Sequence, residues 1–178
     1  RHTISYAVTG FQTCALPILV QGNADSRACI RLSGADVVLG ARLQTPLSQR
    51  RDGLANRANL KGFAFEYMTA GRVVVLGDPG PWICSGMTGG TIYCHTDPAL
   101  GLTQEALRQR LAWGAQVHFS ALDDADVDIV NNLLLEYHRE LLHSYQNDEA
   151  QQISQIMARS RTAFVKISAG SDPDPQTH

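Results

Sequence analysis

The chain contains an ungapped internal repeat, in which residues 22–34 align with residues 77–89 at an offset of 55. Both copies begin and end with glycine and carry Asn or Asp at the second position. They also share a cysteine, an apolar residue and a Ser or Thr in register. Each copy is followed by a β-type run, at residues 36–39 and 91–94. We therefore expect one structural unit to occur at least twice in this chain.

The repeat predicts short strands separated by glycine turns. Val, Ile, Thr and Tyr favour strands, and glycine tolerates the positive φ that tight turns need. Residues 73–76 are continuously apolar, which is typical of a strand covered on both faces. The following Gly-Asp-Pro-Gly-Pro at 77–81 cannot continue a central strand. We expect a mainly β fold, a single-stranded β-helix (β-solenoid), over residues 19–98. Because such a unit needs neighbours, we expect further coils before it.

The composition becomes helical after about residue 98, so residues 99–168 are expected to form an α-helical C-terminal extension. Thr103 as an N-cap predicts a helix over 104–113. Brief strands are expected at 116–119 and 164–167, and a short helix from Asp148. Residues 169–178, which contain Ser-Asp-Pro-Asp-Pro, are expected to be a disordered tail.

A longer helix is predicted from Asp123 or Asp124 to about Tyr145, because its apolar residues recur three and four positions apart. Acidic residues in its first turns complement the helix dipole. The face expected to be buried consists of Val127, Val130, Leu134, Tyr137, Leu141 and Tyr145.

The first eighteen residues are interpreted as foreign to the fold. Residues 8–18 resemble the translation of a common sequencing adapter, with Phe11 in place of Val. The alternative is a short signal peptide, but its apolar stretch would be brief and would contain Pro17. We expect residues 1–18 to be such an artefact or a disordered leader, and the authentic chain to enter at about Leu19 in mid-domain.

Charge and cysteine content exclude several classes of protein. The net charge of −2 and the pI near 6.3 argue against a nucleic-acid partner, which would require a basic face. The longest apolar run, residues 14–20, is far too short for a membrane span, so no membrane partner is expected. Four cysteines at irregular spacing do not make a disulfide framework, and we expect a cytoplasmic location.

Candidate metal sites in the sequence are weak. His138 and His143 are five residues apart, about 140° around a helix, so they cannot share one metal. Cys84, Cys94 and His95 lack a fourth ligand at a usual spacing, and buried core cysteines are the preferred interpretation. A nucleophilic Cys-His pair remains an alternative without a supporting signature.

Other polar motifs also have plain structural interpretations. The glycine-rich stretch 86–90 precedes a strand rather than a helix, so it is expected to be a corner and not a phosphate loop. The acids at 123–126 lack the spacing of a calcium loop and are expected to start a helix. Asp36, Asp52 and Glu66 show no paired partner. The basic cluster Arg50, Arg51, Arg57 and Lys61 is interpreted as a solvated loop, with an acidic partner as the alternative. We predict no catalytic, cofactor-binding or metal-binding residues.

Two strings carry a family resemblance. Residues 66–77 (Glu-Tyr-Met-Thr-Ala-Gly-Arg-Val-Val-Val-Leu-Gly) and 85–90 (Ser-Gly-Met-Thr-Gly-Gly) are similar to the C-terminal GXGXG (alpha-subunit) domain of the glutamate synthase large subunit. The similarity extends over about 22–167. It implies a right-handed β-helix that acts as a rigid spacer between an amidotransferase domain and a domain holding FMN and an iron–sulfur cluster. The parent enzyme would convert glutamine, 2-oxoglutarate and reductant into two glutamates.

None of the catalytic motifs of that enzyme is present, so the resemblance implies neither catalytic residues nor a cofactor in this chain. It implies that the partners are the preceding domains of the same chain, together with a reductase small subunit or ferredoxin. The alternative is a standalone β-helix protein or binding module, which would resemble the glycine-rich β-helical component of formylmethanofuran dehydrogenase.

Overall fold

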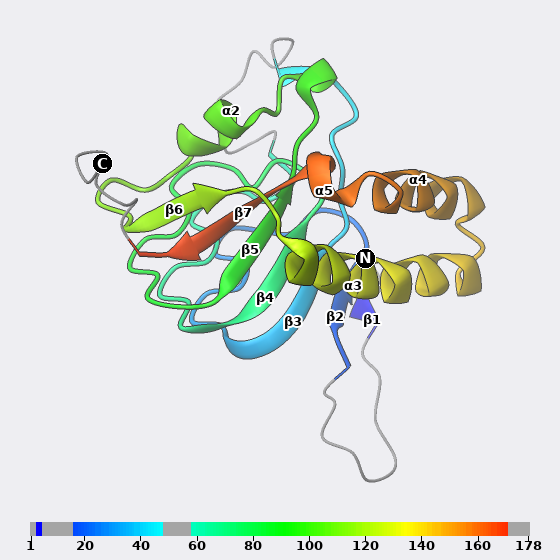
Figure 1. Cartoon of the computed structure of the whole chain (residues 1–178), viewed down its shortest axis with the longest axis horizontal. Coiled ribbons are helices and arrows are strands. Elements are labelled where there is room, and N and C mark those ends of the chain that lie inside the picture. The colour runs from blue at the N-terminus through cyan, green and yellow to red at the C-terminus, as the bar shows by residue number, and fades with distance from the viewer. Residues whose placement is uncertain (1–2, 5–15, 48–57, 171–178) are drawn as a thin grey trace, which may run out of the picture.

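The chain forms a mixed α/β fold around one open sheet (Figure 1). The computed structural model describes residues 3–4, 16–47 and 58–170. Within them the strand order is β1-β2-β3-β4-β5-β7-β6, with β2 to β5 parallel and the remaining pairings antiparallel. The strands are β1 (Thr3–Ile4), β2 (Ile18–Val20), β3 (Ser33–Leu39), β4 (Ala70–Val75), β5 (Thr91–His95), β6 (Val117–Ser120) and β7 (Phe164–Ala169).

The helices gather in the C-terminal half. They are the 3-10 turn η2 (Pro98–Leu100) and the α-helices α2 (Gln104–Arg108), α3 (Asp124–His143), α4 (Asn147–Met157) and α5 (Ser160–Ala163). Figure 1 shows α3 and α4 running side by side as a hairpin against one side of the sheet. Asp123 and Asp126 form a capping box that fixes the start of α3.

Three connecting loops stack on one another behind the sheet. We call this the turn stack; it consists of residues 23–32, 59–69 and 78–88. Its backbone hydrogen bonds run from loop to loop, for example from the Phe65 amide to the Ala28 carbonyl (2.9 Å) and from the Cys84 amide to the Ala64 carbonyl (3.0 Å). The two aligned repeats therefore occupy the outer loops. A third copy, offset by 36 residues from the first and by 19 from the second, lies between them.

Positive φ occurs at three alternate positions in each loop of the turn stack, mostly at residues other than glycine. In the middle loop these are Phe63 (54°), Phe65 (64°) and Tyr67 (53°). The equivalents are Arg27, Cys29 and Arg31 in the first loop and Trp82 and Cys84 in the third, where Gly86 takes the last position. Because left-handed φ is unfavourable for side-chain-bearing residues, the cross-loop hydrogen bonds must hold these conformations in place.

Glycine is required where two loops come into backbone contact. A Cβ on Gly71 would lie 2.5 Å from the Ala35 carbonyl oxygen, and one on Gly89 would collide with the Thr69 carbonyl. Both glycines follow the loop at the point where the chain enters the next strand. The close loop spacing therefore depends on glycine at these points.

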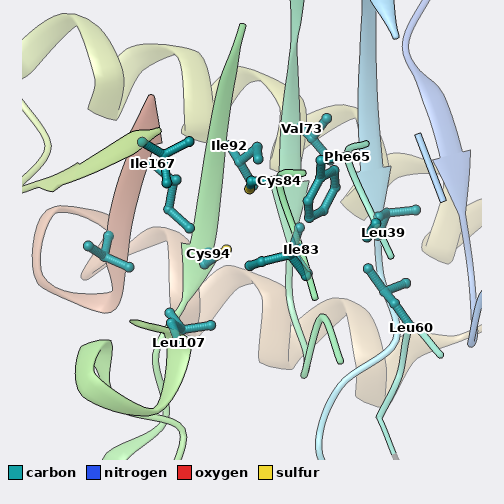
Figure 2. Packing of buried hydrophobic residues seen from close by; sticks show 14 of the residues in the cluster. Leu39, Leu60, Phe65, Val73, Ile83, Cys84, Ile92, Cys94, Leu107 and Ile167 are labelled. Atoms are coloured by element: carbon teal, nitrogen blue, oxygen red, sulfur yellow. The ribbon is translucent and has the colours of Figure 1, made fainter. Parts of the chain in front are cut away.

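Two hydrophobic cores lie on opposite faces of the sheet. Alternate residues of the strands point to opposite faces, so Val73 and Val75 belong to one cluster and Val74 to the other. The first core packs the sheet against the turn stack; Figure 2 shows Phe65 and Ile83 of the stack among the strand side chains. The second core packs the sheet against α3 and α4. The expectation that the apolar run at 73–76 is covered on both faces is confirmed.

The predicted fold class is wrong. The chain is not a mainly β, single-stranded β-helix with helices appended, because its sheet is open and mixed and α3 and α4 form a full layer on it. The physical reason lies in β7, which returns from the C-terminal region and pairs antiparallel with β5. The predicted boundary between 98 and 99 stays a prediction; the first core contains residues from both sides of it.

Local expectations in the helical half hold with shifted ends. The helix predicted over 104–113 ends at Arg108, because the carbonyl of Arg110 accepts from the Ile83 amide and the Ala112 amide donates to the Ile83 carbonyl. These tertiary bonds compete with continuation of the helix. The predicted buried face of α3 is confirmed at Val130, Leu134, Tyr137 and Leu141, but Tyr145 lies beyond the helix end, at positive φ, and is exposed.

Candidate binding cavity

A polar cavity opens where β2 and β3 end. Its volume is about 440 Å³, and its lining residues are Gln21, Gly22, Asn23, Ala41, Arg42, Gln44, Asn59 and Glu149. The cavity combines one cationic side chain, one carboxylate and several amides, and it has a single alanine methyl as its apolar side chain. Carboxyl ends of parallel strands are a frequent location for ligand sites in α/β sheets.

Asn59 organises the floor of this cavity. It is 8 % exposed, and its side-chain amide donates to the Asn23 Oδ1 atom (3.0 Å) and to the Arg42 carbonyl oxygen (3.1 Å). Its Oδ1 atom accepts from the Asp78 amide (2.8 Å). Asn23, Asn59 and Asp78 are equivalent positions of the three stacked loops. This polar column therefore joins the turn stack to the end of β3.

A buried ion pair between Arg110 and Asp78 stabilises the column at its Asp78 end. The Arg110 guanidinium donates to both carboxylate oxygens of Asp78, at 2.5 and 2.8 Å, and its Nη1 atom donates to the Ala106 carbonyl (2.6 Å). Asp78 is 1 % exposed and Arg110 is 4 % exposed. The Asp78 carboxylate also accepts from the Gly80 amide (2.9 Å). A bidentate pair with further hydrogen bonds is the arrangement in which a buried charge is tolerated.

Helix α4 forms the opposite wall. Gln21 Nε2 donates to Glu149 Oε2 (3.1 Å), which links the end of β2 to the first turn of the helix. Arg42 donates through Nη1 to Gln152 one turn later. The cavity walls are thus tied together by side chains from α4 and from the segments that follow β2 and β3.

Tyr137 of α3 lies against the strand end next to the cavity. Its ring packs so closely on Gly40 that a Cβ there would collide with the hydroxyl. The hydroxyl is buried and has no hydrogen-bond partner among the described residues. Burial raises the pKa of Tyr137, and the charge of Glu149 adds to the effect while Arg42 opposes it. Tyr137 is therefore a neutral phenol close to both charged cavity residues.

A second polar group lies on the α3 side of the sheet. Arg72 forms a bidentate pair with Asp36 across β4 and β3, at 2.7 and 2.5 Å, beside a cavity of about 270 Å³. Farther along, Asp126 accepts from the Tyr93 hydroxyl (2.8 Å) and from Lys166 Nζ (2.9 Å). Burial and this hydrogen bond raise the pKa of Tyr93, so it stays protonated. The Asp126 contacts anchor α3 to the sheet, whereas the Arg72–Asp36 pair links β4 to β3.

The sequence candidates for metal binding do not converge. No group of three or more His, Cys, Asp or Glu side chains that could hold a metal occurs in the part of the chain that the structure describes. Cys84 and Cys94 are fully buried in the first core, as expected of core cysteines, and burial raises the pKa of Cys84 to about 12. His138 is half-buried and His143 is exposed and near Glu140. The described residues do not fit an iron–sulfur cluster, which needs several converging thiolates.

His95 has a distinct environment. It is 3 % exposed, lies edge-on to the Phe164 ring at 5.4 Å, and its Nε2 atom has no hydrogen-bond partner among the described residues. Burial lowers its pKa to about 4. His95 is therefore neutral at physiological pH.

The remaining sequence candidates are structural. Residues 86–90 form a corner before β5, and Asp123 and Asp126 cap α3, as expected. Asp36 and Glu66, which showed no partner in the sequence, pair with arginines: Asp36 with Arg72, and Glu66 with Arg27 at 3.4 Å.

The candidates Arg50, Arg51, Asp52 and Arg57 lie outside the described residues. Lys61 contacts Asp25 at 3.4 Å. The expectation that the chain has no catalytic, cofactor or metal residues stays a prediction. No helix among residues 3–4, 16–47 and 58–170 has the length and hydropathy to cross a membrane.

Sequence reasoning missed the cavity, because its residues come from four separated segments. Asn23 and Asp78 were visible as matching positions of the repeat, but their middle partner Asn59 was not. In the middle copy, Ala58 and Ala70 replace the framing glycines. An alignment at offsets of 36 and 19 would have found it.

No curated protein matches the chain. The GXGXG motif family model matches residues 57–170, which include the second and third loops of the turn stack, strands β4 to β7 and the helices between them. This match is consistent with the C-terminal GXGXG domain of glutamate synthase. Because the match covers more than half of the 178 residues, the chain belongs to the GXGXG motif family.

Proposed function

We propose that this chain is the C-terminal domain of a glutamate synthase large subunit and acts there as a rigid spacer. The preceding amidotransferase domain would release ammonia from glutamine, and a domain with FMN and an iron–sulfur cluster would use it to convert 2-oxoglutarate into glutamate. A reductase small subunit or ferredoxin would supply the electrons, in the cytoplasm. In this proposal the chain holds the two catalytic domains in position and provides no catalytic residue.

The observation that supports this role is the turn stack with its buried polar column. Each loop is hydrogen-bonded to the next through backbone groups, and the Asp78–Arg110 pair ties the third loop to the segment after α2. Hydrophobic cores on both sheet faces add to this rigidity. A spacer between two active sites has to resist bending, because a small displacement of reacting partners costs rate.

The experiment uses the complete polypeptide and the variant Arg110→Met, which loosens the column without changing any residue of the proposed catalytic domains. We expect glutaminase activity to persist while the ratio of ammonia released to glutamate formed rises. Arg139→Met, which removes an exposed i,i+3 pair with Glu136, is the matched control and should leave the ratio unchanged. An unchanged ratio in Arg110→Met, at a temperature where unfolding measurements show the domain loosened, would contradict the spacer role.

The alternative, a standalone protein or binding module, is favoured by one observation, the polar cavity. Intact-mass and peptide analysis of the natural protein separates the two proposals. Amidotransferase and flavin-domain peptides in the same polypeptide as residues 57–170 support the spacer. A natural polypeptide without them supports the separate protein.

A further inference from the structure

The cavity at the ends of β2 and β3 has hydrogen-bonding groups that the fold leaves available. Asn59 donates to Asn23 Oδ1, so the Asn23 amide nitrogen remains as a donor. Gln21 donates a hydrogen bond from Nε2 to Glu149 Oε2, so Gln21 Oε1 and Glu149 Oε1 remain as acceptors. Among the described residues, none of these three atoms has another hydrogen-bond partner.

Arg42 supplies the positive charge. Its guanidinium carries five N–H donors, and within the described part of the chain its one side-chain hydrogen bond goes through Nη1 to Gln152. The Arg42 carbonyl is held by Asn59, which fixes the backbone from which the side chain extends. The guanidinium therefore reaches the cavity with donors to spare.

These groups divide into donors and acceptors with opposite charges. The donors are Arg42 and Asn23, and the acceptors are Glu149 and Gln21. A carboxylate would be recognised by the first pair and an ammonium by the second, through charge-assisted hydrogen bonds. A purely anionic ligand would be repelled by Glu149. An apolar ligand would leave these polar groups without hydrogen-bond partners.

We propose that this cavity binds a small zwitterion, a free α-amino acid with a polar side chain, with its carboxylate on Arg42 and Asn23 and its ammonium on Glu149 and Gln21. The volume of about 440 Å³ falls within the range of small-molecule sites. The remaining amide, on Gln44, faces the same cavity and suits a polar rather than an apolar side chain. The proposal does not depend on the glutamate synthase assignment, because it rests on the lining residues alone.

The test is isothermal titration calorimetry of the whole chain with L-asparagine and L-glutamine as probes. L-glutamine amide lacks the carboxylate and N-acetyl-L-glutamine lacks the ammonium, so each removes one half of the recognition. We expect each derivative to bind at least about tenfold more weakly than L-glutamine, since a hydrogen bond to a charged group is lost. L-leucine should also bind more weakly than either polar probe.

Two variants assign the binding to this cavity. Arg42→Gln and Glu149→Gln should each weaken binding of the parent amino acid by about tenfold or more. Arg42→Gln should also lose the discrimination against L-glutamine amide, and Glu149→Gln the discrimination against the N-acetyl derivative. Arg139→Gln and Glu105→Gln, on exposed faces of α3 and α2, are the matched controls and should leave affinity unchanged.

Two results would overturn the proposal. One is the absence of binding by either polar amino acid to chain that is folded by circular dichroism. The other is binding that survives Arg42→Gln and Glu149→Gln with the same preference among derivatives. The second result would place the ligand elsewhere on the protein.

Discussion

The Asp78–Arg110 pair should be the most sensitive single point in the fold. The variant Arg110→Met keeps an unbranched apolar stem at this position but removes the guanidinium that neutralises Asp78. The carboxylate is 1 % exposed, so water cannot replace the lost donors at 2.5 and 2.8 Å. Breaking a buried pair by removing one partner costs about 3–5 kcal/mol. That is a large share of the roughly 5–15 kcal/mol by which a domain is stable.

The measurement is equilibrium urea unfolding of the whole chain, followed by circular dichroism. With an m-value of about 2 kcal/mol per molar urea, a loss of about 4 kcal/mol lowers the midpoint by about 2 M. The control Arg139→Met removes an exposed pair with Glu136 and should cost about 0–1 kcal/mol. The double variant Asp78→Asn with Arg110→Met should be more stable than Arg110→Met alone, because it no longer buries a charge. A loss below about 1 kcal/mol for Arg110→Met would refute the reasoning.

Three further predictions test other parts of the structure. Gly40→Ala should destabilise the chain by about 1–3 kcal/mol, because the new methyl meets the Tyr137 ring; adding Tyr137→Leu should recover part of the loss in the same unfolding assay. Burial lowers the His95 pKa from 6.5 to about 4, so between these pH values His95 is protonated in the unfolded chain and neutral in the folded chain. Stability should therefore fall by about 3 kcal/mol as pH drops from 6.5 to 4, and His95→Gln should flatten this profile; an unchanged profile would contradict the assignment. Because burial raises the Cys84 pKa from 9.0 to about 12, native Cys84 should react with a thiol reagent at pH 8 about a thousandfold more slowly than in urea, as measured by site-resolved mass spectrometry. Equal rates would show an exposed thiolate.

The helical half was largely predictable because its signals are local. Asp123 and Asp126 cap α3 within four residues of sequence, and the apolar spacing marks Val130, Leu134 and Tyr137 as its buried face. Thr103 likewise caps α2 as expected. The sequence did not reveal that the backbone of Ile83 forms hydrogen bonds with the Arg110 carbonyl and the Ala112 amide. These bonds end the helix early. Tertiary hydrogen bonds override local propensity there.

The fold class was mispredicted because the deciding contacts are distant in sequence. The pairing of β5 with β7 joins residues about 70 positions apart, and nothing in the run 164–167 indicates its partner. The repeat did locate two loops of the turn stack correctly. It associated positive φ with glycine at the turns, and Phe63, Phe65 and Trp82 also adopt positive φ here. Hydrogen bonds from the neighbouring loops hold these residues at positive φ.

The left-handed residues bear on how the cavity forms. An isolated loop with alternating positive φ at Phe63, Phe65 and Tyr67 would relax, since each such residue is unfavourable without compensating bonds. The bonds that compensate come from the neighbouring loops, so the stack has to form cooperatively rather than one loop at a time. Asn23 and Asn59, which shape the cavity, belong to this same cooperative unit. A ligand that binds only the formed cavity must therefore raise the stability of the stack as well, by RT ln(1 + [L]/Kd). Conversely, Arg110→Met, which never touches the cavity lining, should weaken apparent amino-acid affinity once it unfolds a measurable fraction of the stack.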